Sequence, residues 1–353
     1  MSEPDLVVAC VSSHTGPEWR WIDARLRAEG IDCRFHYLKP TGDGAPHGRE
    51  ACRQAIALAR DTGGVLVTHG VPAALACATL QRLSRARARH VAWSWHHPTT
   101  PRRRDRWHAR LVVGAVDAFV VHSRLEAEWQ HGLLGIPPRK LEVVPWPYEE
   151  GDALSLAAPP PAPAEYACMI GASDRDLPTL FAAMERLPDV PLVIAVRPEN
   201  LEGLRPPPNV QVHLRLPKPQ AWSLVAGCKV FVLPLGSRSA RTGHSCLVQA
   251  MAFGRPVVTT DSLGLWEYVR PGETALVVPP GDPDRLAEAL RTLWTDAAWA
   301  AAIGDAGREL AESALSERQV ARGAADLLRR LAGRPTRRRP PPLLAPTAVT
   351  SAS

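Results

Sequence analysis

A polar loop and the helix after it carry the residues best suited to bind an anion. The loop GSRSARTGHS follows an apolar strand expected over 230–235, and a short helix is expected over 246–253. The backbone N–H groups of Gly243, His244 and Ser245 would lie at the start of this helix, where unpaired donors and the helix dipole favour a phosphate. Arg238 and Arg241 add positive charge to the same loop. The residues alone predict either a pyrophosphate site or a solvated basic loop.

A histidine pair is a second candidate for chemistry. His96 and His97 directly follow an apolar strand expected over 90–95, at its carboxyl end. Ligands gather at the carboxyl ends of strands in parallel sheets, and a neutral imidazole there can hydrogen-bond a substrate. The alternative is that this pair, which precedes Pro98, is only a feature of the loop.

Strands and helices alternate along the first part of the chain. Apolar runs predict the strands, and segments with helical spacing predict the helices between them. The expected strands cover 6–10, 33–38, 65–68, 90–95, 118–121 and 141–144, and the expected helices cover 19–29, 49–60, 72–83, 107–116 and 124–132. This order is typical of a parallel sheet covered by helices on both faces. We therefore expect a Rossmann-like domain over 1–150.

The alternation begins again after a proline-containing stretch. Strands are expected over 166–170, 191–196, 210–214, 230–235 and 257–260, with helices over 178–187, 219–226, 246–253 and within 284–331. Residues 151–165 have no periodicity and are interpreted as an interdomain linker or a surface loop. A second Rossmann-like domain is expected over 166–333, and a disordered basic tail over 334–353. The predicted fold class is α/β, with two doubly wound domains facing across a ligand-binding cleft.

Composition limits the classes of function. A length of 353 residues with 45% hydrophobic residues suits about two globular domains. No apolar run approaches the ~20 residues that span a bilayer, and the acidic opening MSEPD lacks the basic region of a signal peptide, so a cytoplasmic protein is expected. The seven cysteines form no CxxC pair, which argues against a zinc site or a disulfide framework. The net charge of +6 favours an anionic partner.

The segment from Thr242 to Leu290 resembles the donor-binding half of glycosyltransferase family 4, the glycosyl transferases group 1. The motifs that carry the resemblance are Gln249-Ala250-Met251-Ala252-Phe253-Gly254, then Pro256-Val257-Val258, Gly264 with Glu267, and Gly281-Asp282-Pro283. Enzymes of this family are retaining and have the GT-B fold, in which the C-terminal domain binds a nucleotide sugar and the N-terminal domain mainly binds the acceptor. The resemblance implies a GT-B glycosyltransferase with an NDP-sugar as co-substrate and no other cofactor.

The resemblance also implies roles for individual residues on the donor side. In the family, two glutamates eight positions apart contact the donor, and Arg241 and Gln249 stand at the corresponding positions. Gln249 can hydrogen-bond ribose hydroxyls without the charge of a carboxylate, whereas Arg241 inverts the charge. For Glu267, a structural hydrogen bond within its own loop is the alternative to a ligand contact. The implied donor-binding residues are Arg175, Arg241, Gly243, His244, Ser245, Gln249 and Glu267.

On the N-terminal side, the family has a histidine near the donor sugar, and His96 or His97 corresponds to it as the catalytic position. The first loop approaches the acceptor in the family, and here it contains Ser13, His14 and Gly16, although the usual Gly-Gly pair is absent.

The motif Asp174-Arg175-Asp176 resembles a metal-binding DxD sequence. We interpret Asp176 as the cap of the helix that follows, so no metal site is predicted.

The arginines between positions 82 and 110 form a basic cluster, interpreted either as a solvated surface or as a contact with anionic lipid. Nucleic acid is disfavoured because no motif that reads it is present.

The predicted function is retaining, metal-independent transfer of a sugar from an NDP-sugar to a glycan, lipid-linked or small-molecule acceptor. This reaction would serve polysaccharide or glycoconjugate biosynthesis, in the cytoplasm or peripherally at the inner face of the membrane. The alternative, suggested by Arg241 and Gln249, is a catalytically impaired GT-B protein that binds the donor or partners another glycosyltransferase.

Overall fold

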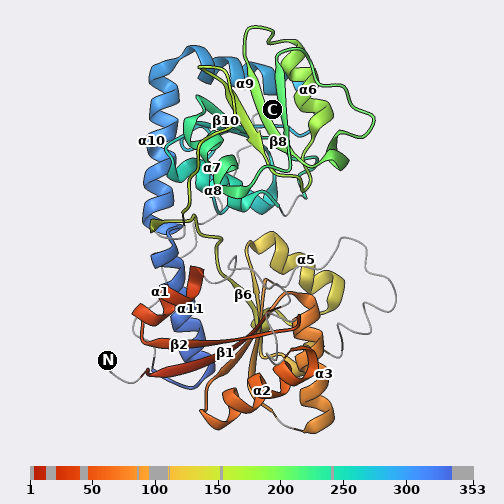
Figure 1. Cartoon of the computed structure of the whole chain (residues 1–353), viewed down its shortest axis with the longest axis vertical. Helices are drawn as coiled ribbons and strands as arrows, with labels where there is room; N and C mark the ends of the chain where they lie inside the picture. Colours follow the sequence, from red (N-terminus) through yellow and green to blue (C-terminus); the bar gives the residue numbers. More distant parts are fainter. Residues whose placement is uncertain are drawn as a thin grey trace. The chain divides into compact units, whose positions relative to one another are not determined.

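The computed structural model describes residues 4–12, 21–39, 47–85, 87–94, 110, 112–151, 154–239 and 242–335. The chain divides into two compact units (Figure 1). The first unit contains residues 1–145 and the segment that begins at Glu317, and the second contains residues 146–316. This division differs from the predicted domains at 1–150 and 166–333. We describe each unit by itself.

The first unit is built on a six-stranded parallel sheet with the strand order β2-β1-β3-β4-β5-β6. Its strands are β1 (Leu6–Ser12), β2 (Ile31–Tyr37), β3 (Val65–His69), β4 (Arg89–Trp93), β5 (Ala118–Val121) and β6 (Leu141–Val143). Its helices are α1 (Trp21–Ala28), α2 (Gly48–Asp61), α3 (Val71–Ser84), α5 (Arg124–Leu134) and α11 (Glu317–Leu331). Within the predicted helix 107–116, residues 110 and 112–115 are helical, and residues 107–109 and 111 lie outside the described residues.

Alternation of side chains along β1 explains why both faces of this sheet are covered. Val8 and Cys10 point into the core shared with α1 and α11, whereas Ala9 and Val11 point into the core shared with α2 and α3. A strand buried on both faces needs apolar residues at nearly every position, and the run LVVAC provides them.

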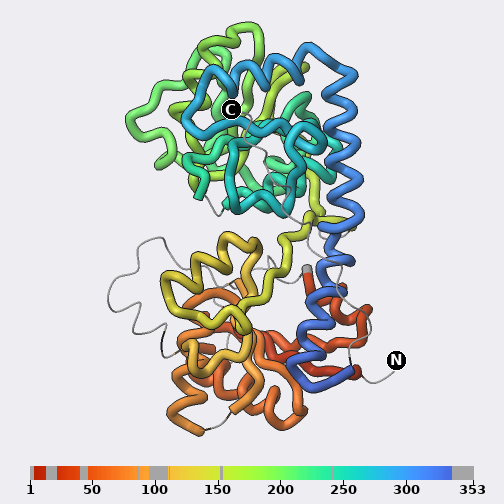
Figure 2. The backbone as a smooth tube through the Cα atoms, turned by 180° about the vertical axis from the view of Figure 1, so that it is seen from behind, coloured from red at the N-terminus to blue at the C-terminus, as the bar shows by residue number. Residues whose placement is uncertain are grey.

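Helix α11 belongs to the first unit, although the sequence analysis assigned it to the second domain. Its residues Val320, Ala324 and Leu327 recur at helical spacing and are buried in the same core as Ile22 of α1. Figure 2 shows α11, in blue, alongside α1, in red. The burial of this apolar stripe against α1 is the physical reason for the difference from the predicted boundary.

The second unit is built on another six-stranded parallel sheet, with the order β12-β11-β10-β7-β8-β9. Its strands are β7 (Ala167–Ile170), β8 (Leu192–Val196), β9 (Val210–Leu214), β10 (Val230–Leu233), β11 (Val257–Thr260) and β12 (Leu276–Val278). Its helices are α6 (Leu177–Glu185), α7 (Lys218–Gly227), α8 (His244–Ala252), α9 (Pro283–Thr295) and α10 (Ala297–Ala314). Strand β12 was not predicted, because three residues are too few to show a period.

The two faces of the second sheet have separate cores. Phe231 and Leu233 of β10 pack with α7, α8 and α10, whereas Val230 and Val232 pack with α6 and α9. The two doubly wound parallel sheets confirm the predicted α/β class.

The stretch predicted as a linker is a surface segment of the second unit. Ser223 Oγ donates to the carbonyl of Ala157 at 2.6 Å, and the Nε2 of Gln211 donates to the carbonyl of Pro161 at 2.7 Å. These contacts agree with the surface-loop interpretation of residues 151–165, and the boundary between the units falls at 145/146 instead.

Candidate functional site: the switch point of the second sheet

The strand order of the second sheet identifies where a ligand would bind. Strands β7 and β10 are neighbours at the centre, and the chain continues from them in opposite directions along the sheet. At such a switch point the two connections after the strands diverge and leave a crevice at the carboxyl edge. Strand β7 ends at Ile170 on this edge, where Gly171 follows it, and Pro234 and Leu235 follow β10 there.

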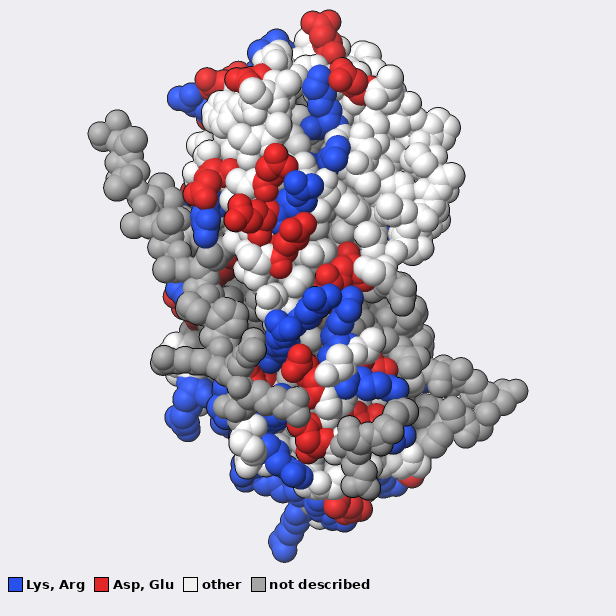
Figure 3. Space-filling model, turned by 90° about the vertical axis from the view of Figure 1, so that its left-hand side faces the viewer, with Lys and Arg blue, Asp and Glu red and all other residues white. Residues whose placement is uncertain are grey.

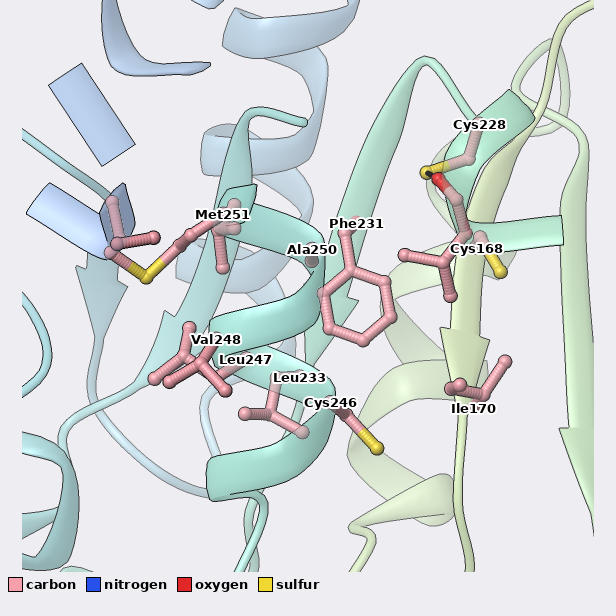
Figure 4. Close-up of a cluster of buried hydrophobic side chains, with 14 of the residues drawn as sticks. Cys168, Ile170, Cys228, Phe231, Leu233, Cys246, Leu247, Val248, Ala250 and Met251 are labelled. Atoms are coloured by element: carbon pink, nitrogen blue, oxygen red, sulfur yellow. Dashed lines mark hydrogen bonds between the residues drawn. The ribbon is translucent and has the colours of Figure 1, made fainter. Parts of the chain in front are cut away.

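Helix α8 begins at the same edge, because the chain leaves β10 and turns into it after a short loop. Its N-cap residue is Gly243, with φ +93°, and a Cβ there would lie 3.1 Å from the Cδ2 of Leu233. The left-handed backbone favours glycine here, and a Cβ would fit only if the side chain of Leu233 shifted by a few tenths of an ångström. Figure 4 shows Leu233 beside the first turn of α8.

The first turn of α8 can hold an anion. The first N–H groups of any α-helix, here those of His244, Ser245 and Cys246, have no acceptor within the helix. They carry the positive end of the helix dipole, which favours a phosphate. Gly243 and Ser245 are half-buried, and the side chains of His244 and Cys246 are buried. Helix α8 begins at His244, two residues before the predicted start at 246, so His244 and Ser245 lie in its first turn.

Arg175 lies at this turn. Its Nε donates to the carbonyl of Ile170 at 3.1 Å, and its Nη1 donates to the carbonyl of Ser173 at 2.7 Å. Its Nη2 donates to the Sγ of Cys246 at 3.5 Å. Figure 4 shows Cys246 directed from α8 toward the strand that carries Ile170. Three contacts thus fix a guanidinium between β7 and the first turn of α8.

Gly171 makes room for this guanidinium. Its φ is +97°, and a Cβ there would lie 2.6 Å from the Nη2 of Arg175, closer than real atoms approach. The position therefore requires glycine for its backbone and for the arginine beside it. A fixed guanidinium and a helix N-terminus together form a preorganised anion site.

His244 holds the wall of the site in place. Its Nε2 lies 2.8 Å from the carbonyl of Gly264, and its ring packs at 4.8 Å, tilted, on the ring of Tyr268. Because a carbonyl only accepts, the Nε2 of His244 carries the proton in this contact. Glu267, on the same loop, is buried. His244 thus connects the first turn of α8 to the loop that contains Gly264 and Tyr268.

Gln249 has partners other than those predicted. Its side chain is 1% exposed. Its Oε1 accepts from the N–H of Glu149 at 2.8 Å, and its Nε2 donates to the carbonyl of Glu149 at 3.5 Å. The Glu149 carboxylate accepts from the Nε1 of Trp222 at 3.0 Å and is paired with Lys218. The amide of Gln249 thus fastens residue 149 to α8, and it is engaged there instead of facing open space.

Two charged groups near the site are paired with each other. Arg238 Nε lies 2.8 Å from the Oδ2 of Asp261, and its guanidinium stacks on the ring of Trp266 at 5.9 Å. The Nε1 of Trp266 donates to the other carboxylate oxygen of Asp261 at 3.1 Å. Arg238 was predicted to add positive charge for an anion, and its pairing with Asp261 could not be predicted because nothing in the local sequence pattern connects the two loops.

The remaining predicted site residues, Arg241, His96, His97, Ser13, His14 and Gly16, lie outside the described residues. At the carboxyl edge of the first sheet the structure instead describes His122, which directly follows β5. Its Nδ1 lies 2.9 Å from the carbonyl of Val144, so this nitrogen carries the proton, and its Nε2 accepts from Ser94 Oγ at 2.9 Å. His122 was not predicted as a site residue, although its position directly after an apolar strand is visible in the sequence.

Two units, each built on a doubly wound six-stranded parallel sheet, are the components of the GT-B fold. Residues 174–296 match the family described as glycosyl transferases group 1, which confirms the predicted resemblance over this part of the chain. Curated protein sequences include no match to the chain.

Solved structures support the same fold across almost the whole chain. HepE from Anabaena, solved with UDP and with UDP-glucose, is 14% identical, with a TM-score of 0.67, over 92% of this chain and 99% of its own. Sucrose-phosphate synthase from Thermosynechococcus elongatus is 18% identical, with a TM-score of 0.69, over 93% of this chain and 99% of its own. A glycosyltransferase from Rickettsia africae is 11% identical, with a TM-score of 0.70, over 92% of this chain and 98% of its own.

Proposed function

We propose that the protein transfers a sugar, with retention of configuration, from an NDP-sugar donor to an acceptor. The donor diphosphate would bind at the first turn of α8, against the guanidinium of Arg175. The observation that carries this proposal is the position of that guanidinium, which three contacts hold at the switch point of the second sheet.

The chemistry follows from where charge develops. As the bond between sugar and phosphate breaks, negative charge accumulates on the departing diphosphate. Donors fixed in advance stabilise that charge without reorganising, and the N–H groups of α8 and the guanidinium of Arg175 are such donors. Positive charge supplied in this way performs the role that a metal ion has in other transferases, so the reaction would be metal-independent.

Retention would arise from attack on the same face of the sugar that the phosphate leaves. The departing phosphate would accept the proton of the acceptor hydroxyl, so no protein nucleophile is required. His96 or His97 would hydrogen-bond the sugar or the leaving group, and Ser13, His14 and Gly16 would lie near the acceptor. Glu267 stays a proposed donor-side residue, whereas Gln249 is left out of the donor set because Glu149 occupies its amide.

UDP and UDP-glucose are the first donors to test, because HepE was solved with both. The acceptor would be a glycan, a lipid-linked sugar or a small molecule, in the synthesis of a polysaccharide or glycoconjugate. The protein would act in the cytoplasm, peripherally at the inner face of the membrane where the acceptor is lipid-linked. Within the described residues, no helix is long and apolar enough to cross a bilayer.

The second candidate function is binding of the donor without catalysis, or association with another glycosyltransferase as its partner. Gln249 favours this second function, because an active member of the family is expected to have a carboxylate at this position. Here the position holds an amide, and that amide is hydrogen-bonded to the backbone of Glu149.

Release of UDP from UDP-sugars, with and without candidate acceptors, separates the two functions. Acceptor-dependent release that persists in EDTA and falls in Arg175→Gln supports the enzyme. Tight UDP binding without release for any donor and acceptor supports the second candidate. Arg308→Gln is a matched control, because Arg308 is an exposed arginine of α10 paired with Asp305.

A further inference from the structure

Three side chains at the carboxyl edge of the second sheet have no role in the phosphate site described above. Asp261 directly follows β11, Arg238 lies in the loop after β10, and Trp266 follows the short 3-10 helix over 263–265. The Nε of Arg238 and the Nε1 of Trp266 each contact one carboxylate oxygen of Asp261, and the guanidinium lies over the indole ring. We call these three residues the Asp261 cluster.

The Asp261 cluster lies on the loops that border the first turn of α8. The N–H of Leu263 donates to the carbonyl of Arg238 at 2.9 Å, which joins the loop after β11 to the loop after β10. One residue further along, the carbonyl of Gly264 accepts from His244 at the start of α8. A diphosphate bound at this turn therefore brings the groups bonded to it, the sugar and the ribose, to the loops around it.

The cluster keeps hydrogen-bonding capacity for a ligand. Among the described residues, the two terminal nitrogens of Arg238 have no acceptor, and this side chain is 55% exposed. The side chain of Asp261 is 30% exposed, and a carboxylate can accept more hydrogen bonds than the two it receives here. The Nε contact and the indole ring orient the guanidinium in advance. Oriented donors and acceptors thus lie side by side.

The chemistry of the cluster fits a pair of neighbouring hydroxyl groups. Such a pair can donate to the carboxylate of Asp261 while it accepts from the terminal nitrogens of Arg238. The charges of Arg238 and Asp261 cancel, and the carboxylate repels a further anion, so the cluster is unsuited to a phosphate. The indole of Trp266 adds an apolar surface that the C–H groups of a sugar ring can cover.

We propose that the Asp261 cluster binds the sugar of the donor and selects a neutral sugar with neighbouring hydroxyl groups. This inference rests on the proposed donor site at α8 and adds the class of sugar, which that site does not define. A sugar that has a carboxylate, such as a uronic acid, would bring a second negative charge to Asp261. The ribose has the same pair of hydroxyls, but a hexose ring presents a larger C–H surface to Trp266.

Calorimetric titration of UDP, UDP-glucose and UDP-glucuronic acid tests this assignment. The wild type is expected to bind UDP-glucose about tenfold more tightly than it binds UDP or UDP-glucuronic acid. Asp261→Asn removes the charge at nearly constant size, so the gain from glucose should be lost while affinity for UDP stays within about twofold. The same variant should bind UDP-glucuronic acid about tenfold more tightly than the wild type does, because Arg238 then lacks an anionic partner. A merely structural role of Asp261 would not reverse the preference between the two sugars.

Asp305→Asn is the matched control, because Asp305 is paired with Arg308 at 3.0 Å on α10 and both side chains are more than half exposed. Figure 3 shows Lys and Arg side chains beside Asp and Glu side chains in its upper part, on the side of the second unit where α10 lies in Figure 1. This variant should leave all three affinities unchanged, and far-ultraviolet circular dichroism checks that both variants are folded.

Three results would overturn the proposal. An equal loss of affinity for UDP and UDP-glucose in Asp261→Asn would assign the cluster to the ribose. Equal affinity of the wild type for UDP and UDP-glucose would remove the sugar contact, as would an unchanged preference between the two sugars in Asp261→Asn. Binding of none of the three ligands by the wild type would contradict the donor site itself and, with it, the sugar site.

Discussion

The amide of Gln249 gives the sharpest prediction, because its predicted and observed roles differ. Substitution Gln249→Ala removes the acceptor of the Glu149 N–H at 2.8 Å, in a site where the glutamine is 1% exposed. A buried donor left without an acceptor costs about 1–3 kcal/mol. We therefore expect the free energy of unfolding to fall by about 2 kcal/mol, which corresponds to roughly 4–8 °C in the melting temperature of a unit this size.

Two assays on the same protein separate the structural role from a ligand contact. Urea denaturation followed by circular dichroism measures the loss of stability, and calorimetric titration measures affinity for UDP. Affinity is expected to stay within about twofold, because the amide is engaged by Glu149. Gln54→Ala on the exposed face of α2 is the matched control and should change stability by less than about 0.5 kcal/mol. Unchanged stability together with about a tenfold loss of affinity for UDP would refute this reasoning and would support a contact between Gln249 and the ribose of the donor.

Three further predictions concern other elements. Gly171→Ala should displace the guanidinium of Arg175, and calorimetry should then find UDP affinity lowered by about tenfold. Burial lowers the pKa of His90 from 6.5 to about 3, so the folded state keeps it neutral and loses stability as the pH falls below 6.5. Lowering the pH from about 7.5 to about 5 should cost about 2 kcal/mol in urea denaturation, and His90→Asn should remove this component. Asp176→Ala removes the side-chain acceptor of the Thr179 N–H at 3.1 Å, which should lower the free energy of unfolding by about 1 kcal/mol.

Local pattern was enough to predict most of the two sheets. The strands are buried on both faces, so runs such as LVVAC and VFVL are visible without knowledge of their neighbours. A helix cap was also predictable from local sequence: Asp176 accepts from the N–H of Thr179, three residues later, so its predicted role as a cap is confirmed. Helix α11 was predicted as a helix but assigned to the wrong unit, because its apolar stripe does not specify which core buries it.

The site was predictable in its residue types and much less in its contacts. Gly243, His244 and Arg175 could be selected from the sequence, and the structure brings Arg175 to the first turn of α8. The partner of Gln249 could not be predicted, because Glu149 lies a hundred positions earlier in the chain. The pairing of Arg238 with Asp261 was missed for the same reason, since only the parallel packing of β10 and β11 brings the two loops together.

Calorimetric titration of UDP into the wild-type protein, Arg175→Gln and Arg308→Gln tests the central claim most directly. A diphosphate held by α8 and Arg175 predicts micromolar binding to the wild type. The same affinity is expected for Arg308→Gln, with a loss of about tenfold or more in Arg175→Gln. Equal affinity in all three proteins would contradict the claim, because the fixed guanidinium would then have no part in binding the donor.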